Sequence, residues 1–290
     1  MNILVTGSNG QLGSEIKDLA AKYKDFSFFF RDLPALDICS SDQLDVFLTE
    51  NKINTVINCA AYTAVDKAEQ DAEIAEKVNS EGVLNLVNAL AKVNGKLIHI
   101  STDYVFDGNR FLPYQESDEV NPIGVYGNTK RSGELAVLNS DIDGIVIRTS
   151  WLYSAYGNNF VKTMLRLGNE RDELGVIFDQ VGTPTNASDL AQACLDILSS
   201  KKQSKINSKG NLYHFSNEGV ASWYDFAITI MALGKVVCHI KPIETKDYPT
   251  AAKRPHFSVL NKSKIKKDFE IEIPYWRNSL AACITKLHKK

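Results

Sequence analysis

The sequence has no long apolar segment and no excess of charge of one sign. None of its apolar runs approaches the ~20 residues that a helix needs to span a bilayer. It holds 33 Lys and Arg against 35 Asp and Glu, a formal net charge of −2, so no broad basic field indicates a nucleic-acid partner. We therefore expect a protein that binds neither membranes nor nucleic acids.

The sequence also lacks a cysteine framework. Its five cysteines are an odd number, and no two of them form a C-x-x-C pair. This favours free thiols in a reducing compartment over disulfides or a zinc site. The strand expected at residues 2–6 runs directly into a glycine loop, so we expect no signal peptide and a cytoplasmic location.

The first half of the chain alternates short apolar runs with segments of helical spacing. The strands are expected at 2–6, 26–30, 55–59, 96–101 and 144–148. The helices are expected at 11–24, in a segment capped by Ser41 or Asp42, at 72–93 and at 124–139. Strands separated by helices of this length imply right-handed crossovers and a parallel sheet covered on both faces. The fold class is thus α/β, with a doubly wound parallel sheet.

The second half breaks this rhythm. Helices are expected at 159–171, 188–198, 223–233 and 276–287, and strands at 176–178 and 212–216. The polar, basic stretch 201–210 reads as an exposed loop. We place a boundary near residue 150 and expect some later elements to return to the first sheet.

A glycine loop joins the first expected strand to the first helix. Its G-x-x-G-x-x-G spacing, Gly7 to Gly13, is typical of the short-chain dehydrogenase/reductase superfamily. The glycines permit a tight turn, close approach of the backbone to a pyrophosphate, and packing of helix on strand, while the helix N-terminus attracts phosphate. Residues 1–150 are therefore predicted to form a Rossmann-type NAD(P)-binding domain, and 151–290 a mainly substrate-binding region. The cofactor contacts predicted here are Gly7, Gly10, Gln11, Leu12 and Gly13.

The end of the second strand leaves the choice of cofactor open. An acidic residue there usually binds the adenosine ribose, whereas an arginine favours the 2′-phosphate of NADP. This chain offers both, Arg31 and Asp32. Either NADH or NADPH is expected.

Tyr126 and Lys130 carry the predicted chemistry. Their i, i+4 spacing on an expected helix places both side chains on one face. A ketone reductase must protonate the carbonyl oxygen, and a nearby ammonium lowers a tyrosine pKa toward the useful range. Tyr126 is then the general acid, and Lys130 also holds the nicotinamide ribose. Thr102, at the end of the fourth strand, would hold the substrate carbonyl, with Ser101 as its competitor.

Longer segments resemble one family from end to end, the dTDP-4-dehydrorhamnose reductases. The matching segments, in the order of the family, are 60–69, 101–108, 125–130, 148–153, 157–165, 179–185, 222–226 and 254–255. The resemblance implies that NAD(P)H reduces the C4 ketone of dTDP-4-dehydro-L-rhamnose to give dTDP-L-rhamnose.

The resemblance also implies roles for further residues. For the cofactor it implies Asp37, Ile38, Ala61, Tyr62 and Thr63. For the dTDP-linked 4-ketosugar it implies Thr102, Asp103, Tyr104, Trp151, Asn159 and Arg254, the last two near the diphosphate. Alternatives stay open, since Asp37 also suits a turn or a helix cap, a tryptophan at 151 also suits a core, and an arginine before a proline also suits a surface ion pair.

Some members of the family bind Mg²⁺ through glutamates at a dimer interface. Glu15 matches one such position, and Asp189 is a candidate stand-in for another. The remaining ligands have no clear match. We therefore leave Mg²⁺ open without predicting it, and we leave a homodimer open.

Two other readings compete with a reductase. A sugar-nucleotide epimerase or dehydratase of the same superfamily keeps a tightly bound NAD. A 4,6-dehydratase, however, needs an acid–base carboxylate pair beside the Ser/Thr, and here Tyr104 follows Asp103. A non-catalytic subunit resembling the β subunit of methionine adenosyltransferase would suit a degraded catalytic set, whereas Thr102, Tyr126 and Lys130 are all present.

Overall fold

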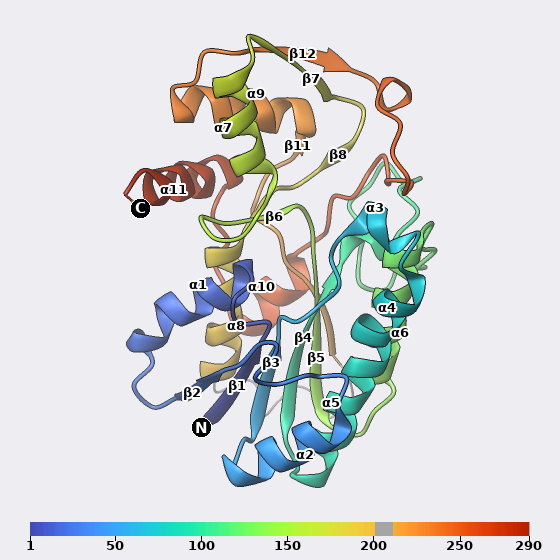
Figure 1. Cartoon of the computed structure of the whole chain (residues 1–290), viewed down its shortest axis with the longest axis vertical. Coiled ribbons are helices and arrows are strands. Elements are labelled where there is room, and N and C mark those ends of the chain that lie inside the picture. The colour runs from blue at the N-terminus through green and yellow to red at the C-terminus, as the bar shows by residue number, and fades with distance from the viewer. Residues whose placement is uncertain (201–210, 290) are drawn as a thin grey trace.

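A six-stranded parallel sheet forms the centre of the molecule in the computed structural model, which describes residues 1–200 and 211–289 (Figure 1). Its strand order is β10-β5-β4-β3-β1-β2, and every neighbouring pair is parallel. The strands are β1 (Asn2–Thr6), β2 (Ser27–Phe30), β3 (Thr55–Asn58), β4 (Lys96–Thr102), β5 (Asp143–Thr149) and β10 (Asn211–His214). The predicted Rossmann-type α/β fold is confirmed.

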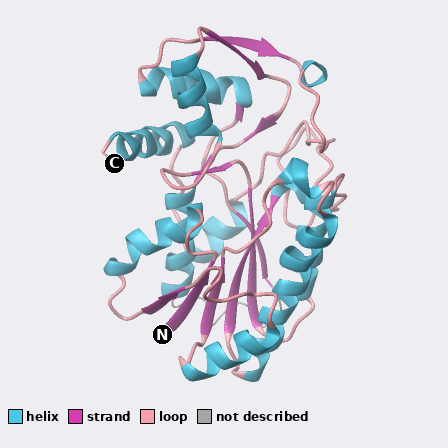
Figure 2. Cartoon of the chain, in the orientation of Figure 1, coloured by secondary structure: helices cyan, strands magenta, loops and turns pink. Residues whose placement is uncertain are grey.

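Each inner strand buries both of its faces, because successive side chains point to opposite sides of a strand. In β1, Ile3 and Val5 join a core on one face, and Leu4 joins a second core on the other. The first core is covered by α1 (Gln11–Leu19), α8 (Ala187–Ser199) and α10 (Ser263–Phe269). The second is covered by α2 (Ser41–Glu50), α5 (Gly82–Lys92) and α6 (Val125–Leu138). Figure 2 shows these helices on either side of the strands.

Several expected boundaries change in the structure, and the strand expected at 176–178, for example, is Glu173–Ile177. The helix expected at 11–24 ends at Leu19 and continues as a 3₁₀ turn, Ala20–Lys22. The cap of α2 is Ser40, whose side chain accepts from the Gln43 amide, so Ser41 and Asp42 lie inside the helix. The helix expected at 72–93 consists of α4 (Ala72–Glu76), a π-helical turn (Lys77–Glu81) and α5.

The π-helical turn allows a close contact with α6. A Cβ on Gly133 would lie 2.2 Å from the Asn79 carbonyl oxygen, so only glycine permits this approach. The turn also directs the buried Asn79 side chain toward residues that follow β3. π-Turns within α-helices often occur at functional sites.

The second region has a core of its own above the sheet (Figure 1). Its helices are α7 (Phe160–Glu170), α9 (Trp223–Gly234) and α11 (Trp276–His288). Three short strand pairs join them: β7 (Glu173–Ile177) with β12 (His239–Ile243), β6 (Leu152–Tyr153) with β9 (Thr185–Asn186), and β8 (Val181–Gly182) with β11 (Ala221–Ser222). The loop expected at 201–210 lies outside the described residues.

Parts of the second region return to the first sheet. β10 pairs with β5 through Leu212 and Val146, and α8 packs against α1. No helix within residues 1–200 and 211–289 is long and apolar enough to cross a membrane.

Candidate functional site

A cleft of about 810 Å³ opens at the carboxyl ends of the parallel strands. It lies where the strand order reverses, since β1 has β2 on one side and β3 on the other. Open α/β sheets bind their ligands at such a switch point. The predicted site residues that line the cleft are Gly7, Gly10, Gln11, Leu12, Asp37, Ile38, Ala61, Tyr62, Thr63, Thr102, Asp103, Tyr104, Tyr126, Lys130, Trp151 and Asn159. Among the predicted residues, Gly13, Arg31 and Arg254 are not part of the lining.

The glycine turn is shaped to receive a pyrophosphate. Gly7 has φ +59°, and a Cβ there would lie 2.6 Å from the Ala60 amide nitrogen. A Cβ on Gly13 would lie 2.5 Å from the Ser8 Cα, so this glycine lets α1 pack against the turn. The N-cap of α1, Gly10, has no side chain to cap the helix, which leaves the first amides available for phosphate. These residues therefore fit a dinucleotide cofactor.

Asp32 and Arg31 occupy different places at the adenosine end of the cleft. The Asp32 carboxylate lines the cleft and accepts hydrogen bonds from the amides of Asn9 (3.0 Å) and Leu33 (2.9 Å). The Arg31 guanidinium donates to the Phe30 carbonyl (2.8 Å) and lies 5.1 Å from the centre of the Phe47 ring. Asp32 thus holds the glycine turn in place, whereas Arg31 lies outside the lining of the cleft.

Lys130 is held by the backbone of β4. Its Nζ donates to the Ile100 carbonyl over 2.6 Å, and the residue is only 2% exposed. Burial lowers the pKa of Lys130 to about 8, because the charged ammonium loses its hydration. The side chain therefore titrates close to neutral pH.

Tyr126 is protonated at neutral pH in this environment. Burial raises the pKa of Tyr126 to about 12, and the interaction with the neighbouring Thr102 hydroxyl offsets this only in part. The lowered pKa expected beside Lys130 is wrong for this structure, because burial raises the pKa of this phenol. A protonated phenol is the form that a proton donor needs.

The structure separates Thr102 from its competitor Ser101. The Ser101 hydroxyl donates to Glu134 Oε1 over 2.6 Å and is thereby committed to the interior. The Thr102 hydroxyl accepts from the Tyr104 amide (3.2 Å) and donates to the Asp103 carboxylate (3.1 Å). Thr102 is thus the hydroxyl beside Tyr126, and its role toward the substrate carbonyl stays a prediction.

A buried ion pair that was not predicted supports this trio. Glu134 and Arg148 are 0% and 1% exposed, and the guanidinium donates to both carboxylate oxygens over 2.7 Å. Arg131 adds a third ionic contact at 2.7 Å. The pair ties α6, which carries Tyr126 and Lys130, to β5.

Asn79 supports the wall of the cleft after β3. Its side chain accepts from the Tyr62 amide (2.9 Å), donates to the Tyr62 carbonyl (3.1 Å) and donates to Thr129 Oγ1 (3.1 Å). The backbone of 61–63 is therefore fastened to α6. A buried asparagine inside an apolar helical pattern was the signal that sequence reasoning left unused.

Two stacked tryptophans line the side of the cleft that faces the second region. The Trp151 and Trp223 rings are 3.6 Å apart and nearly parallel, with 9° between their planes. Trp151 adopts φ +48°, a strained conformation for a large residue, and a Cβ on Gly182 would lie 2.7 Å from its ring. Trp151 therefore lines the cleft and packs on the second region at once.

The other residues predicted to contact the sugar or its diphosphate already make different contacts within the protein. Asp103 is buried beside Thr102, and burial raises the pKa of its carboxyl to about 6. The Tyr104 ring meets the Tyr126 ring edge to face at 5.4 Å. Asn159 caps α7 through the Lys162 amide (3.2 Å) and donates to Gln11 Oε1 (3.0 Å).

Arg254 forms an ion pair and does not line the cleft. Its guanidinium donates to both oxygens of Asp66, over 3.1 Å and 2.6 Å. Asp66 lies on the short helix α3 (Val65–Ala68), which follows the cofactor wall. A contact between Arg254 and a diphosphate stays a prediction, and it requires the guanidinium to share or leave this partner.

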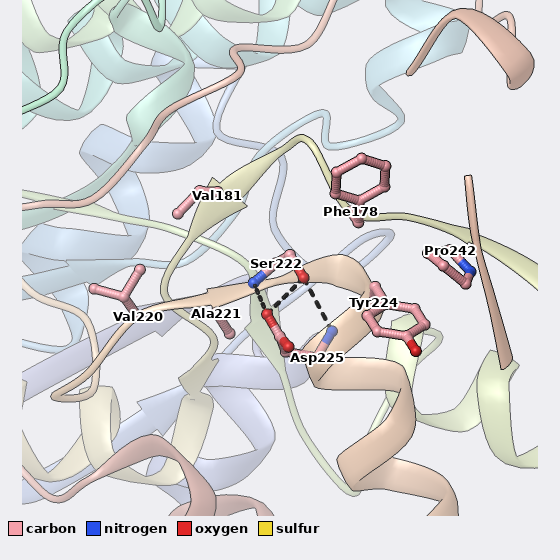
Figure 3. Close-up of a pocket in the computed structure, with 8 residues that line it drawn as sticks. All are labelled: Phe178, Val181, Val220, Ala221, Ser222, Tyr224, Asp225 and Pro242. Carbon is pink, nitrogen blue, oxygen red and sulfur yellow. Dashed lines mark hydrogen bonds between the residues drawn. The ribbon is translucent and has the colours of Figure 1, made fainter. Parts of the chain in front are cut away.

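A second hollow of about 470 Å³ lies in the upper region (Figure 3). Its lining residues are Phe178, Val181, Val220, Ala221, Ser222, Tyr224, Asp225 and Pro242. Ser222 and Asp225 bond to each other in a capping box at the start of α9. Because the lining contains none of the predicted catalytic residues, the cleft at the sheet is the better candidate for the reaction site.

The fold, the glycine turn and the Thr102, Tyr126 and Lys130 set define an NAD(P)-dependent oxidoreductase of the short-chain dehydrogenase/reductase class. A family model described as the RmlD substrate binding domain matches residues 1–289. A dTDP-4-dehydrorhamnose reductase from Aggregatibacter actinomycetemcomitans is 42% identical over 284 residues, 96% of each chain. The chain belongs to the dTDP-4-dehydrorhamnose reductase family.

Solved structures agree with this assignment. A dTDP-4-dehydrorhamnose reductase from Clostridium acetobutylicum superposes with a TM-score of 0.93 at 42% identity, over 99% of this chain and 100% of that one. One from Bacillus anthracis, solved with NADP, gives 0.92 at 35% identity, over 98% and 99%.

Proposed function

We propose that this protein reduces the C4 ketone of dTDP-4-dehydro-L-rhamnose to the alcohol of dTDP-L-rhamnose with NADPH or NADH. The observation that carries the proposal is that Thr102, Tyr126 and Lys130 line the same cleft as the glycine turn. Membership of the reductase family supports the identity of the substrate.

The side chains divide the work of carbonyl reduction. When bound, the reduced nicotinamide supplies the hydride. Thr102 holds the ketone oxygen, and Tyr126, protonated at neutral pH, gives its proton to that oxygen as negative charge develops on it. Lys130, fixed by the Ile100 carbonyl, would hold the nicotinamide ribose and stabilise the resulting phenolate.

The sugar is proposed to lie between Tyr104 and the stacked tryptophans. Aromatic faces suit the apolar face of a deoxysugar, and the two rings hold each other in place. Asp103 lines the cleft beside Thr102, where its carboxyl group would accept a hydrogen bond from a sugar hydroxyl.

The test is an assay with dTDP-4-dehydro-L-rhamnose and each reduced cofactor, followed by loss of NAD(P)H absorbance and identification of the product. We expect one dTDP-L-rhamnose per NAD(P)H consumed. Tyr126→Phe should lower turnover by ~10²–10⁴-fold with little change in cofactor affinity. Near-normal turnover in that variant contradicts the assignment of the acid. Tightly retained NAD with no net reduction favours an epimerase or dehydratase instead.

The assembly and location expected from the sequence stay predictions. Sedimentation equilibrium tests the homodimer, and cell fractionation tests the cytoplasmic location.

A further inference from the structure

An ionic cluster joins the last helix of the chain to the first. Lys286, in the last turn of α11, donates to Glu15 Oε2 over 2.6 Å and to Asp18 Oδ2 over 2.7 Å. Both acids belong to α1 (Figure 1). The first residues of this helix, Gln11 and Leu12, line the cofactor cleft. Glu15 is only 2% exposed, so its charge depends on a partner inside the protein.

The same two carboxylates hold the segment that links β6 to α7. The Ser154 hydroxyl donates to Glu15 Oε1 over 2.6 Å, and the Tyr156 hydroxyl donates to Asp18 Oδ2 over 2.7 Å. Lys286 also lies 4.8 Å from the centre of the Tyr156 ring. One ammonium thus organises two acids and, through them, segment 154–159.

Segment 154–159 rests on the first residue of α1. The Asn159 amide donates to Gln11 Oε1 over 3.0 Å. Gly157, at φ +60°, approaches so closely that a Cβ there would lie 3.0 Å from Gln11 Cγ. Gln11, Gly157 and Asn159 all line the cofactor cleft. Any movement of this segment therefore changes the cleft beside the pyrophosphate position.

The residues around Glu15 do not fit the divalent metal that the family resemblance suggests. Ser154 and Lys286 already occupy both oxygens of Glu15. Asp189, the candidate stand-in for a second ligand, accepts from Asn217 (2.6 Å) and Ser279 (2.5 Å). Within residues 1–200 and 211–289, no group of three or more His, Cys, Asp or Glu is placed to hold a metal. A divalent cation needs several oxygen ligands, and a fixed ammonium beside it would repel it.

We propose that Lys286 is a built-in cation that replaces a divalent metal at Glu15 and positions segment 154–159 on the glycine turn. The ammonium neutralises two adjacent carboxylates, one of them buried, that would otherwise repel each other. By fixing Ser154 and Tyr156, it sets the place of Asn159 and Gln11. Lys286 touches neither cofactor nor substrate, so its role is positioning. Only the effect on cofactor binding rests on the proposed function.

Two measurements that need no turnover test the proposal: the Tm without ligand, in EDTA or in excess MgCl₂, and the Kd for NADPH by fluorescence titration. The wild-type Tm should be the same in both media. Lys286→Met should lower the Tm by roughly 4 °C or more and raise the Kd about tenfold. Lys286→Arg should restore most of both. Lys92→Met, which removes a surface partner of Asp45, is the matched control and should change neither.

Lys286→Glu supplies a gain-of-function arm. It places a third carboxylate beside Glu15 and Asp18, so its Tm should be low in EDTA and rise in MgCl₂, a response that the wild type lacks. If Lys286→Met does not fold, the Tm of Lys286→Glu in EDTA and in MgCl₂ still tests the proposal. A wild-type Tm that rises in MgCl₂ and falls in EDTA contradicts the proposal that Lys286 takes the place of a divalent metal at Glu15. A lowered Tm with an unchanged Kd in Lys286→Met overturns the positioning role. Failure of the ketosugar assay alone leaves both readouts intact.

Discussion

Glu134→Gln removes the negative charge that neutralises Arg148 beneath the catalytic residues. The side chains of Glu134 and Arg148 are 0% and 1% exposed, so water cannot take over the role of the lost carboxylate. Removing one partner of a buried pair leaves an uncompensated charge, at a cost of about 3–5 kcal/mol. We expect the free energy of unfolding to fall by that amount at neutral pH.

The pH dependence of this loss has a definite sign. Burial by itself raises the pKa of Glu134, but hydrogen bonds and charge from Arg148, with help from Ser101 and Arg131, bring it below its ordinary value. A lowered folded-state pKa stabilises the protein above the unfolded pKa of about 4.3, and this stabilisation is lost as the pH falls through the folded value. The gap between wild type and Glu134→Gln should therefore be constant near neutral pH and shrink only in acid below about pH 4.3.

Urea unfolding followed by circular dichroism measures the effect. Glu170→Gln is the matched control, because Glu170 pairs with Arg166 on an exposed face of α7, and its loss should cost no more than ~0.5 kcal/mol. Adding Arg148→Met to Glu134→Gln removes the orphaned charge and should recover part of the stability. A loss below ~1 kcal/mol, or one equal to that of Glu170→Gln, would refute the reasoning.

Three further outcomes follow from the site. Because burial lowers the pKa of Lys130 to about 8, kcat/KM should fall as the pH rises past that value and the ammonium is lost, and a pH profile that stays flat well into the alkaline range contradicts the role of Lys130. Arg31→Leu should raise the KM for NADPH more than that for NADH, since only NADPH carries a 2′-phosphate; equal losses show that Arg31 does not read this group. Arg254→Ala should raise the KM for the nucleotide sugar and leave that for NAD(P)H unchanged, whereas Asp66→Asn, which frees the guanidinium, should not raise it. If Arg254→Ala leaves the sugar KM intact, the pair with Asp66 is purely structural.

The parts of the site that sequence predicted are those encoded locally. The glycine turn and the spacing of Tyr126 and Lys130 each occupy a few consecutive residues, and their place after a strand sets which end of the sheet they reach. Both accordingly line the same cleft. The continuous apolar runs of the strands likewise predicted a sheet covered on both faces.

The parts that sequence did not predict depend on residues far apart in the chain. Arg254 pairs with Asp66, which is 188 residues away in the sequence. The residues next to Arg254 therefore could not indicate its partner. Trp223 enters the cleft only because the second region stacks it on Trp151. The short helix α10 was not predicted, because its only two buried apolar residues, Ile265 and Phe269, lie about one helical turn apart.

The return of β10 to the edge of the sheet limits how this protein can be divided. β10 supplies the last strand beside β5 only after the first part of the second region, including α7 and α8, has been synthesised. A fragment ending at residue 150 would leave the backbone groups along one side of β5 without partners, and such an edge invites aggregation. During translation the nascent sheet must wait for its final strand, or be shielded by a chaperone. The substrate-binding half therefore cannot be exchanged as a cassette between relatives by a single junction, and a chimera needs at least two crossover points that keep β10 with its own sheet.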